Sequence, residues 1–179
     1  MPRNLSDILK KADRLVNRLG SRSAVRAAEE LGITLLYRDF QKQLGAYKVI
    51  LRNRFIFLKS GMDPLMEEIV LWHEIGHDLL HRKEALRQGG FQEFQLFHIR
   101  DQRMEYEANL FAAEAMLPDE AILELIRKGF DIHQIAAELG SNSNLVALKV
   151  DALIFRGYSF RSQEHRSDFL KDGQRVPSS

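Results

Sequence analysis

The chain has 179 residues, which is long enough for one sizeable core carrying a small helical appendage. A formal net charge of +1 excludes a strong global attraction to nucleic acid, so composition gives no reason to expect DNA or RNA binding. The absence of cysteine excludes disulfides and thiolate metal sites, so a bound metal would need His, Asp or Glu ligands.

The N-terminal segment is predicted to be helical. Apolar residues at helical spacing over residues 5–19 are followed by Gly20 as a stop, and Ser21 can cap a second helix over residues 22–31. The segment lacks the continuous apolar stretch of a secretory signal, and nowhere do about 18 apolar residues run together. We therefore expect no membrane span and a cytoplasmic location.

A small antiparallel or mixed sheet is predicted next. Its strands are expected from three apolar runs, at residues 33–37, 45–51 and 55–58. Residues 52–54, Arg-Asn-Arg, suit a hairpin turn between the last two strands. The sheet would therefore precede the segment that carries the histidines.

A long helix is predicted from Pro64 to about His81, because Asp63 can cap it and proline suits the first helical position. Residues 83–101 lack clean periodicity and contain a Gly-Gly pair, which predicts a loop that could act as a flap. The second half of the chain is predicted to be mostly helical, with helices at residues 102–117, 119–128, 132–139 and 144–155.

The long helix contains the sequence HEIGH, in which His73 and His77 are separated by one helical turn. Each residue turns the helix by about 100°, so these side chains lie about 40° apart and can meet one Zn²⁺. Glu74 projects beside them, where it can act as the general base that takes a proton from an attacking water. The arrangement predicts two metal ligands and one catalytic carboxylate.

The competing interpretation is an amphipathic helix that happens to carry histidines. The residues around the motif are strongly apolar, so its polar side chains would be buried and would need a compensating role. Gly76 costs roughly 1 kcal/mol relative to alanine inside a helix, which suggests that another element approaches closely there. Both details favour the metal site.

A third ligand is needed, and nearby residues do not supply it. Metzincins would have glycine at position 80 and histidine at position 83, but this chain has Leu80 and Lys83, so it does not match their pattern. His81 lies two turns from His73, roughly 12 Å along the axis, too far for both to reach one ion. We expect His81 to bond to backbone or to cap the helix end.

The predicted helix at 102–117 offers the missing carboxylate. Glu105 shares a helical face with Asn109 and with small alanines, as expected where this helix packs against Gly76. We predict Glu105 as the third ligand and Asn109 as a hydrogen-bond partner of a ligating histidine. Glu107 is the alternative ligand, with a solvated surface charge as its competing interpretation.

The pair of motifs, HEIGH followed by EYEANLFAAEAMLP, resembles the ImmA/IrrE family of intracellular zinc metallopeptidases over roughly residues 24–152. The resemblance implies an α+β, zincin-like fold in which about three strands pack on the zinc helix and a mostly helical half follows. It implies Zn²⁺ held by His73, His77 and Glu105, with Glu74 as general base. The expected organisation is a metallopeptidase core at residues 1–118, a helical subdomain at 119–157 and a flexible tail at 158–179.

The resemblance also implies proteolysis of a helix-turn-helix repressor that controls a mobile element or a stress response. The sequence shows no repressor-type DNA-binding domain of its own ahead of the core, so we expect a separate protein substrate. The substrate could add as a strand to the sheet edge at residues 45–51. The donor that stabilises the oxyanion stays open among His98, Arg103 and Tyr106.

Residues 132–153 also fit a helix-turn-helix, which suggests a DNA-binding or protein-binding regulator with a structural or vestigial metal site. Charge argues against direct DNA binding, because the second helix of this unit contains one cation, Lys149, and one anion, Asp151. We expect these helices to pack on the core.

Overall fold

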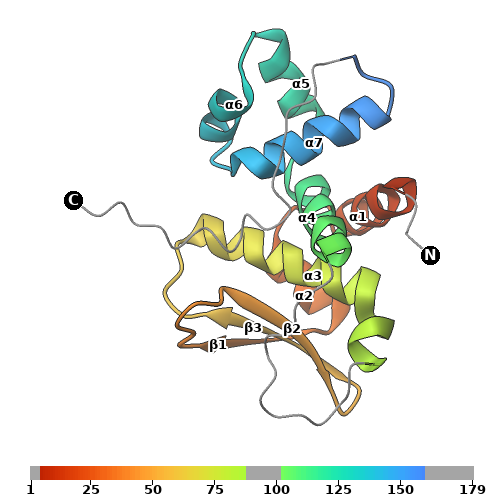
Figure 1. Ribbon diagram of the computed structural model, residues 1–179, viewed down its shortest axis with the longest axis vertical. Helices are drawn as coiled ribbons and strands as arrows, with labels where there is room; N and C mark the ends of the chain where they lie inside the picture. The colour runs from red at the N-terminus through yellow and green to blue at the C-terminus, as the bar shows by residue number, and fades with distance from the viewer. Residues whose placement is uncertain (1–4, 88–101, 160–179) are drawn as a thin grey trace.

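The computed structural model describes residues 5–87 and 102–159 (Figure 1). The strands are β1 (Thr34–Arg38), β2 (Gly45–Ile50) and β3 (Asn53–Lys59). The helices are α1 (Leu5–Leu19), α2 (Ala24–Leu31), α3 (Pro64–Arg87), α4 (Gln102–Met116), α5 (Asp119–Arg127), α6 (Ile132–Glu138) and α7 (Ser143–Phe155). The fold is therefore α+β, with a small sheet followed by a mostly helical half, as the sequence predicts. No helix in these ranges is both long and apolar enough to cross a membrane.

The start of α2 differs from the prediction, because Ser23 rather than Ser21 is its N-cap. The Ser23 side chain accepts a hydrogen bond from the backbone N–H of Arg26. Arg22 stays outside the helix: its carbonyl accepts from the Trp72 indole at 3.1 Å. Its guanidinium donates to two carbonyls at the end of α4. These contacts hold the segment between α1 and α2 in an extended conformation, so α2 begins later in the chain than predicted.

The sheet is mixed, in the order β1-β3-β2, with β1 parallel and β2 antiparallel to β3. The hairpin turn consists of Leu51 and Arg52, whose φ values of 48° and 67° suit a two-residue turn between twisted strands. The prediction of a turn at residues 52–54 is therefore wrong by a small shift. Asn53 already pairs with Ile50 across the ladder.

Helix α3 lies across the sheet (Figure 1) and contacts both β2 and β3. A buried carboxylate fixes this packing: Asp78 accepts from the Tyr47 hydroxyl at 2.6 Å and from Arg54 at 3.0 Å. Arg82, one turn along the helix, binds the same carboxylate through two nitrogens. These contacts join α3 to the sheet.

The beginning of α3 agrees with the prediction and its end does not. Asp63 accepts from the backbone N–H groups of Leu65 and Met66 and so caps the helix. The helix continues beyond His81 to Arg87, because the intervening residues are helix formers without glycine or proline. Residues 83–87 are thus helical, and the rest of the predicted loop, residues 88–101, lies outside the described ranges.

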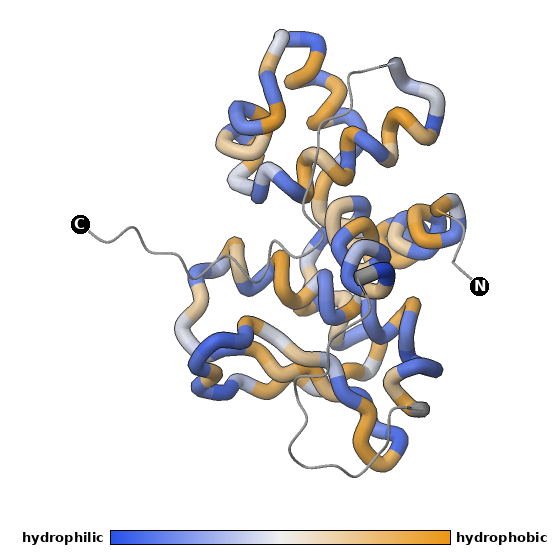
Figure 2. The backbone as a smooth tube through the Cα atoms, viewed as in Figure 1, coloured by the Kyte–Doolittle hydropathy of each residue, from blue (hydrophilic) through white to orange (hydrophobic). Residues whose placement is uncertain are grey.

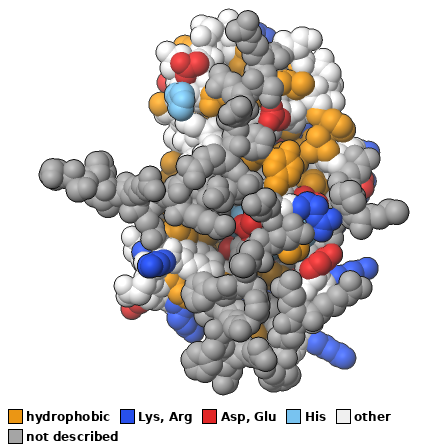
Figure 3. Space-filling view, viewed as in Figure 1, with side chains coloured by type: hydrophobic (Ala, Val, Ile, Leu, Met, Phe, Trp, Pro, Cys, Tyr) orange, Lys and Arg blue, Asp and Glu red, His pale blue; other side chains and the backbone are white. Residues whose placement is uncertain are grey.

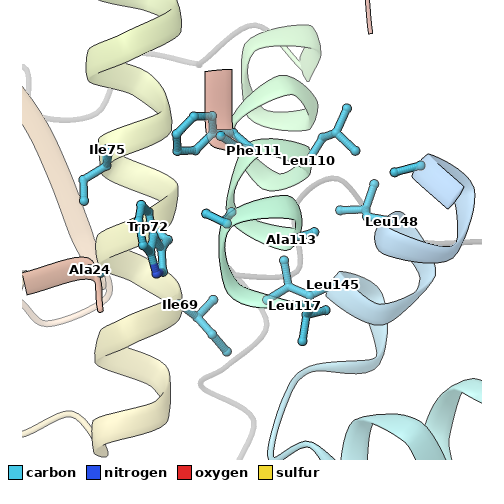
Figure 4. Close-up of a cluster of buried hydrophobic side chains, with 14 of the residues drawn as sticks. Ala24, Ile69, Trp72, Ile75, Leu110, Phe111, Ala113, Leu117, Leu145 and Leu148 are labelled. Carbon is cyan, nitrogen blue, oxygen red and sulfur yellow. The ribbon is translucent and has the colours of Figure 1, made fainter. Parts of the chain in front are cut away.

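The part of the core drawn in Figure 4 lies between α3 and α4 and between α4 and α7. Trp72 of α3 and Phe111 of α4 are fully buried, with ring centroids 6.3 Å apart. Leu145 and Leu148 of α7 cover the other side of α4. Hydrophobic and hydrophilic segments alternate along the helices (Figure 2), as expected for helices that each turn one face inward. Helix α4 is therefore enclosed between α3 and α7.

The last three helices sit beside α4 at the end of the molecule away from the sheet (Figure 1). A buried ion cluster joins them to it: the ammonium group of Lys149 on α7 lies 2.8 Å from Glu114 of α4 and 2.5 Å from Asp119 of α5. Arg156 at the end of α7 also binds Glu114, at 2.8 Å. The division into a core and a subdomain near residue 118 stays a prediction, and the tail beyond residue 159 lies outside the described ranges.

Candidate metal centre

The two motif histidines lie together on the buried face of α3. His73 and His77 are 1% and 6% exposed, and their Nε2 atoms are 3.0 Å apart. Their rings meet edge to face, with centroids 4.6 Å apart. The helical repeat therefore aims two imidazole nitrogens at one point, as the sequence predicts.

The carboxylate of Glu105, on α4, faces that point. Its two oxygens lie 3.4 Å from Nε2 of His73 and 3.5 Å from Nε2 of His77. The three residues are buried, and among the described residues they form the group of His and acidic side chains that could hold one metal ion. The structure thus places Glu105, rather than Glu107, beside both histidines.

The donor set fits a zinc ion. Ligand atoms that bind zinc tetrahedrally at about 2.0–2.1 Å lie about 3.3 Å from one another. The two Nε2 atoms lie 3.0 Å apart, and each of them lies 3.4 or 3.5 Å from a carboxylate oxygen. Two neutral imidazoles and one carboxylate also form a common ligand set of catalytic zinc sites. Three protein ligands leave a fourth position for water or substrate.

Gly76 allows α4 to approach closely enough for Glu105 to reach the histidines. A Cβ atom at this position would lie 3.2 Å from both the Cα and the carbonyl oxygen of Ala108, and 3.3 Å from the Phe111 ring. These contacts are tight, and two of them are with backbone that cannot rotate away. The expectation that another element approaches Gly76 is confirmed.

Asn109 holds His73 in the orientation that a ligand needs. The amide oxygen of Asn109 lies 2.7 Å from Nδ1 of His73, and both residues are buried. An amide oxygen can only accept, so Nδ1 carries the proton, and in this tautomer Nε2 keeps the lone pair that a metal would take. Asn109 therefore stands where the sequence places it, one turn along α4 from Glu105.

His81 and Glu107 are placed differently from the predictions. Nδ1 of His81 lies 3.1 Å from Nδ1 of His77, and Nε2 of His81 lies 3.0 Å from Glu107 Oε2. His81 therefore binds side chains and does not cap the helix, which continues past it. Glu107 is 4% exposed, so a solvated surface charge is wrong. A buried acid has to find a partner, and His81 is that partner.

Glu74 is buried beside the first residue of β2, at 2% exposure. A Cβ atom on Gly45 would lie 3.1 Å from Oε1 of Glu74 and 2.5 Å from a methyl group of Val70. Glycine is therefore needed for β2 to pass this close to α3. Gly45 was not predicted as a position that shapes the site, although a glycine that opens a predicted strand is a signal of close backbone approach.

Of the three predicted oxyanion donors, Arg103 and Tyr106 lie within the described residues. His98 lies outside the described ranges. Arg103 extends toward the far side of Glu107, with its Nε atom 3.9 Å from Oε1. Burial, and secondarily the charge of Asp151 on α7, raises the pKa of Tyr106, which keeps its hydroxyl protonated. The oxyanion donor stays a prediction.

The helix-turn-helix interpretation finds no support in α7. Its residues Leu145 to Val150 are all buried, and the side chain of its one cation, Lys149, is inaccessible to solvent. A recognition helix has to present polar and basic side chains to a groove. On the face shown in Figure 3, the described acidic and basic side chains are interspersed rather than gathered into one basic patch. The helices act as packing elements.

Comparisons with known proteins agree with this geometry. The model of a peptidase family described as the IrrE N-terminal-like domain matches residues 28–151, more than half of the 179-residue chain. The chain is also 28% identical over 137 residues to the uncharacterized immunity region protein 2 of Bacillus phage phi105. That alignment covers 76% of this chain and 84% of the phage protein.

Proposed function

Because the chain belongs to the peptidase family of the IrrE N-terminal-like domain, we propose that it is a zinc-dependent metalloendopeptidase with Glu74 as its general base. The observation that carries the proposal is the convergence of two Nε2 atoms and the Glu105 carboxylate, within 4.8 Å of one another in a buried site. His73, His77 and Glu105 would hold the ion. Glu74, the next residue after His73, is 2% exposed and would supply the catalytic carboxylate beside the three ligands.

When bound, zinc would polarise the scissile carbonyl and lower the pKa of the attacking water. Glu74 accepts the proton that this water loses and afterwards delivers it to the leaving amine. Asn109 keeps the His73 proton on Nδ1, so that Nε2 would be available to a bound ion. The burial of the site excludes bulk water and strengthens these electrostatic interactions.

The edge strand β2 is the proposed docking position for an extended substrate. It pairs with β3 along one side, which leaves its other side without a neighbouring strand among the described residues. Gly45 at its start lies against Glu74, so a peptide added along β2 would pass the general base. This placement favours cleavage within a chain over trimming of its ends.

We further propose that the substrate is a helix-turn-helix transcriptional repressor and that the protein works in the cytoplasm. Support comes from the family resemblance of the two motifs and from a relative described as an immunity region protein. The partner would be a separate protein, bound without direct contact of this chain with nucleic acid. Repressor cleavage would release control of a mobile element or a stress response.

The test is cleavage of a purified helix-turn-helix repressor by the purified, zinc-loaded protein, with the product of the adjacent gene as the first candidate. We expect Glu74→Gln to retain one zinc per chain by metal analysis and to lose cleavage by at least about 100-fold. Glu67→Gln is the matched control, since Glu67 lies on the same helix and bonds the Tyr37 hydroxyl at its exposed end. It should cleave like the wild type.

Two results would contradict the proposal. Undiminished cleavage by Glu74→Gln would remove Glu74 from the role of general base. A wild-type protein that binds no zinc, yet cleaves in the presence of a chelator, would remove the metal from the mechanism. Cleavage of other unfolded chains but not of the repressor would keep the peptidase and reject the substrate.

A further inference from the structure

We propose that His81 and Glu107 form a relay that positions His77 as a metal ligand and fixes which of its nitrogens faces the ion. The relay rests on the proposed metal centre, but its test reads zinc affinity and ring protonation rather than cleavage. His81 comes from α3, one turn beyond His77, and Glu107 comes from α4. Neither residue belongs to the three-ligand group.

The contacts form one continuous chain of side chains. Nδ1 of His77 lies 3.1 Å from Nδ1 of His81, and Nε2 of His81 lies 3.0 Å from Glu107 Oε2. The rings of the two histidines are tilted at 50° with centroids 5.2 Å apart. The second oxygen of Glu107 points toward Arg103, whose Nε atom is 3.9 Å away. The chain thus leads from the metal centre to the protein surface.

When both rings are neutral, one arrangement of protons satisfies both hydrogen bonds in this chain. A carboxylate only accepts, so the neutral His81 ring must carry its proton on Nε2 and donate it to Glu107. Its Nδ1 is then an acceptor, which requires His77 to carry its own proton on Nδ1. Nε2 of His77 then keeps the lone pair that a bound metal ion would take. Glu107 therefore sets the direction of both hydrogen bonds.

The two ligand histidines are thereby held by different devices. His73 is held by one direct hydrogen bond to the Asn109 amide oxygen at 2.7 Å. His77 is held by the relay, in which His81 stands between it and Glu107. Both relay residues are 4% exposed, so their polar atoms would be costly to bury without this use. Outer partners of ligating histidines typically change metal affinity by about 10- to 100-fold. The relay accounts for a buried His-Glu pair that supplies no ligand.

Two substitutions at His81 separate the relay from a merely structural role. The side-chain oxygen of asparagine reaches about the position of Nδ1, so His81→Asn can still accept from His77 but loses Glu107. The amide nitrogen of glutamine reaches about the position of Nε2, so His81→Gln can still donate to Glu107 but leaves His77 without its acceptor. Zinc Kd is measured by competition with a chromophoric chelator on metal-free protein.

The relay predicts an order of affinities. His81→Gln should raise the zinc Kd by about 10- to 100-fold, and His81→Asn by clearly less. His133→Asn is the control, because His133 lies on α6, where it contacts Ser143 at 3.1 Å. This control should leave the Kd unchanged. Thermal unfolding of the metal-free variants shows whether each one is folded.

A measurement on the wild type decides the matter even if a variant fails to fold. Nitrogen-15 NMR of the zinc-loaded protein should show His81 protonated on Nε2 and His77 protonated on Nδ1. The proposal is overturned by the opposite protonation of His81, by an unchanged Kd in a folded His81→Gln variant, or by a stronger loss in His81→Asn. If wild-type protein binds no zinc at all, the proposed function fails with it, and that outcome is distinct from the others.

Discussion

Replacing Gly76 with alanine tests whether the packing of α3 on α4 sets the geometry of the metal centre. The new Cβ atom would lie 3.2 Å from the Cα and carbonyl oxygen of Ala108, so the two helices have to separate by a few tenths of an ångström. Helix α4 cannot retreat freely, because α1 and α7 pack against it as well. The substitution therefore has two opposite effects of similar size on stability, a gain in helix propensity and a cost of overpacking.

Alanine stabilises a helix interior by about 1 kcal/mol relative to glycine. Overpacking of a well-packed interface costs about 1–3 kcal/mol. The expected net change in the free energy of unfolding of the metal-free protein is thus a loss of about 0–2 kcal/mol. Zinc affinity should be more sensitive to this displacement than the free energy of unfolding is, because metal–ligand distances can vary by only about 0.2 Å. Displacement of Glu105 should weaken zinc binding by roughly tenfold, equal to about 1.4 kcal/mol.

The assay combines urea unfolding of the metal-free protein with zinc competition against a chelator. Lys83→Ala serves as the control, since it changes an exposed residue of the same helix and should alter neither quantity. A Gly76→Ala variant that gains about 1 kcal/mol and binds zinc like the wild type would refute the reasoning. It would mean that α4 moves aside without consequence for Glu105.

Three further predictions concern charge and metal. Burial, followed by a hydrogen bond that protonated Asp13 donates to Glu114, raises the pKa of Asp13 to about 6, so its ionisation opposes folding as the pH rises from about 4 through 6. Asp13→Asn should therefore gain stability relative to the wild type across that range in urea unfolding, and a pH-independent difference would contradict this. Lys149→Met should lower the free energy of unfolding by about 3 kcal/mol, because the buried Glu114 loses a cation; a loss below about 1 kcal/mol would refute it. A chelator should lower the Tm of the zinc-loaded wild type but leave that of His73→Ala unchanged, since about 2.7 kcal/mol of linkage is expected at a 100-fold excess of free zinc over Kd.

The elements with strong periodicity or clear punctuation were predictable. Asp63 followed by proline marks the start of α3 in the sequence, and the structure shows its carboxylate capping the helix. Element ends were less predictable. The apolar pattern of α3 fades near His81, but helix formers without glycine or proline carry the helix on to Arg87. The C-terminal end of α3 is therefore set by local helix propensity and could not be predicted from the apolar periodicity.

The candidate site was predictable where one helix supplies its members and less so where two meet. The spacing of His73 and His77 follows from helical geometry alone. Glu105 could be chosen over Glu107 because it shares a face with alanines that fit against Gly76. The contact between His81 and Glu107 also joins α3 and α4, but it was not predicted because the helical spacing of each residue taken alone does not show that the two side chains face each other.

Helix α4 uses several of its faces, and this explains why its position matters so much. One face directs Glu105 and Asn109 at the metal centre, where the Asn109 amide oxygen lies 2.7 Å from His73. Its C-terminal half holds Glu114, which is neutralised by Lys149 at 2.8 Å. Since α4 is one continuous helix of 15 residues, a shift forced on either end is transmitted along it to the other. The buried ion cluster therefore helps to fix the acid ligand, although it lies outside the metal site itself.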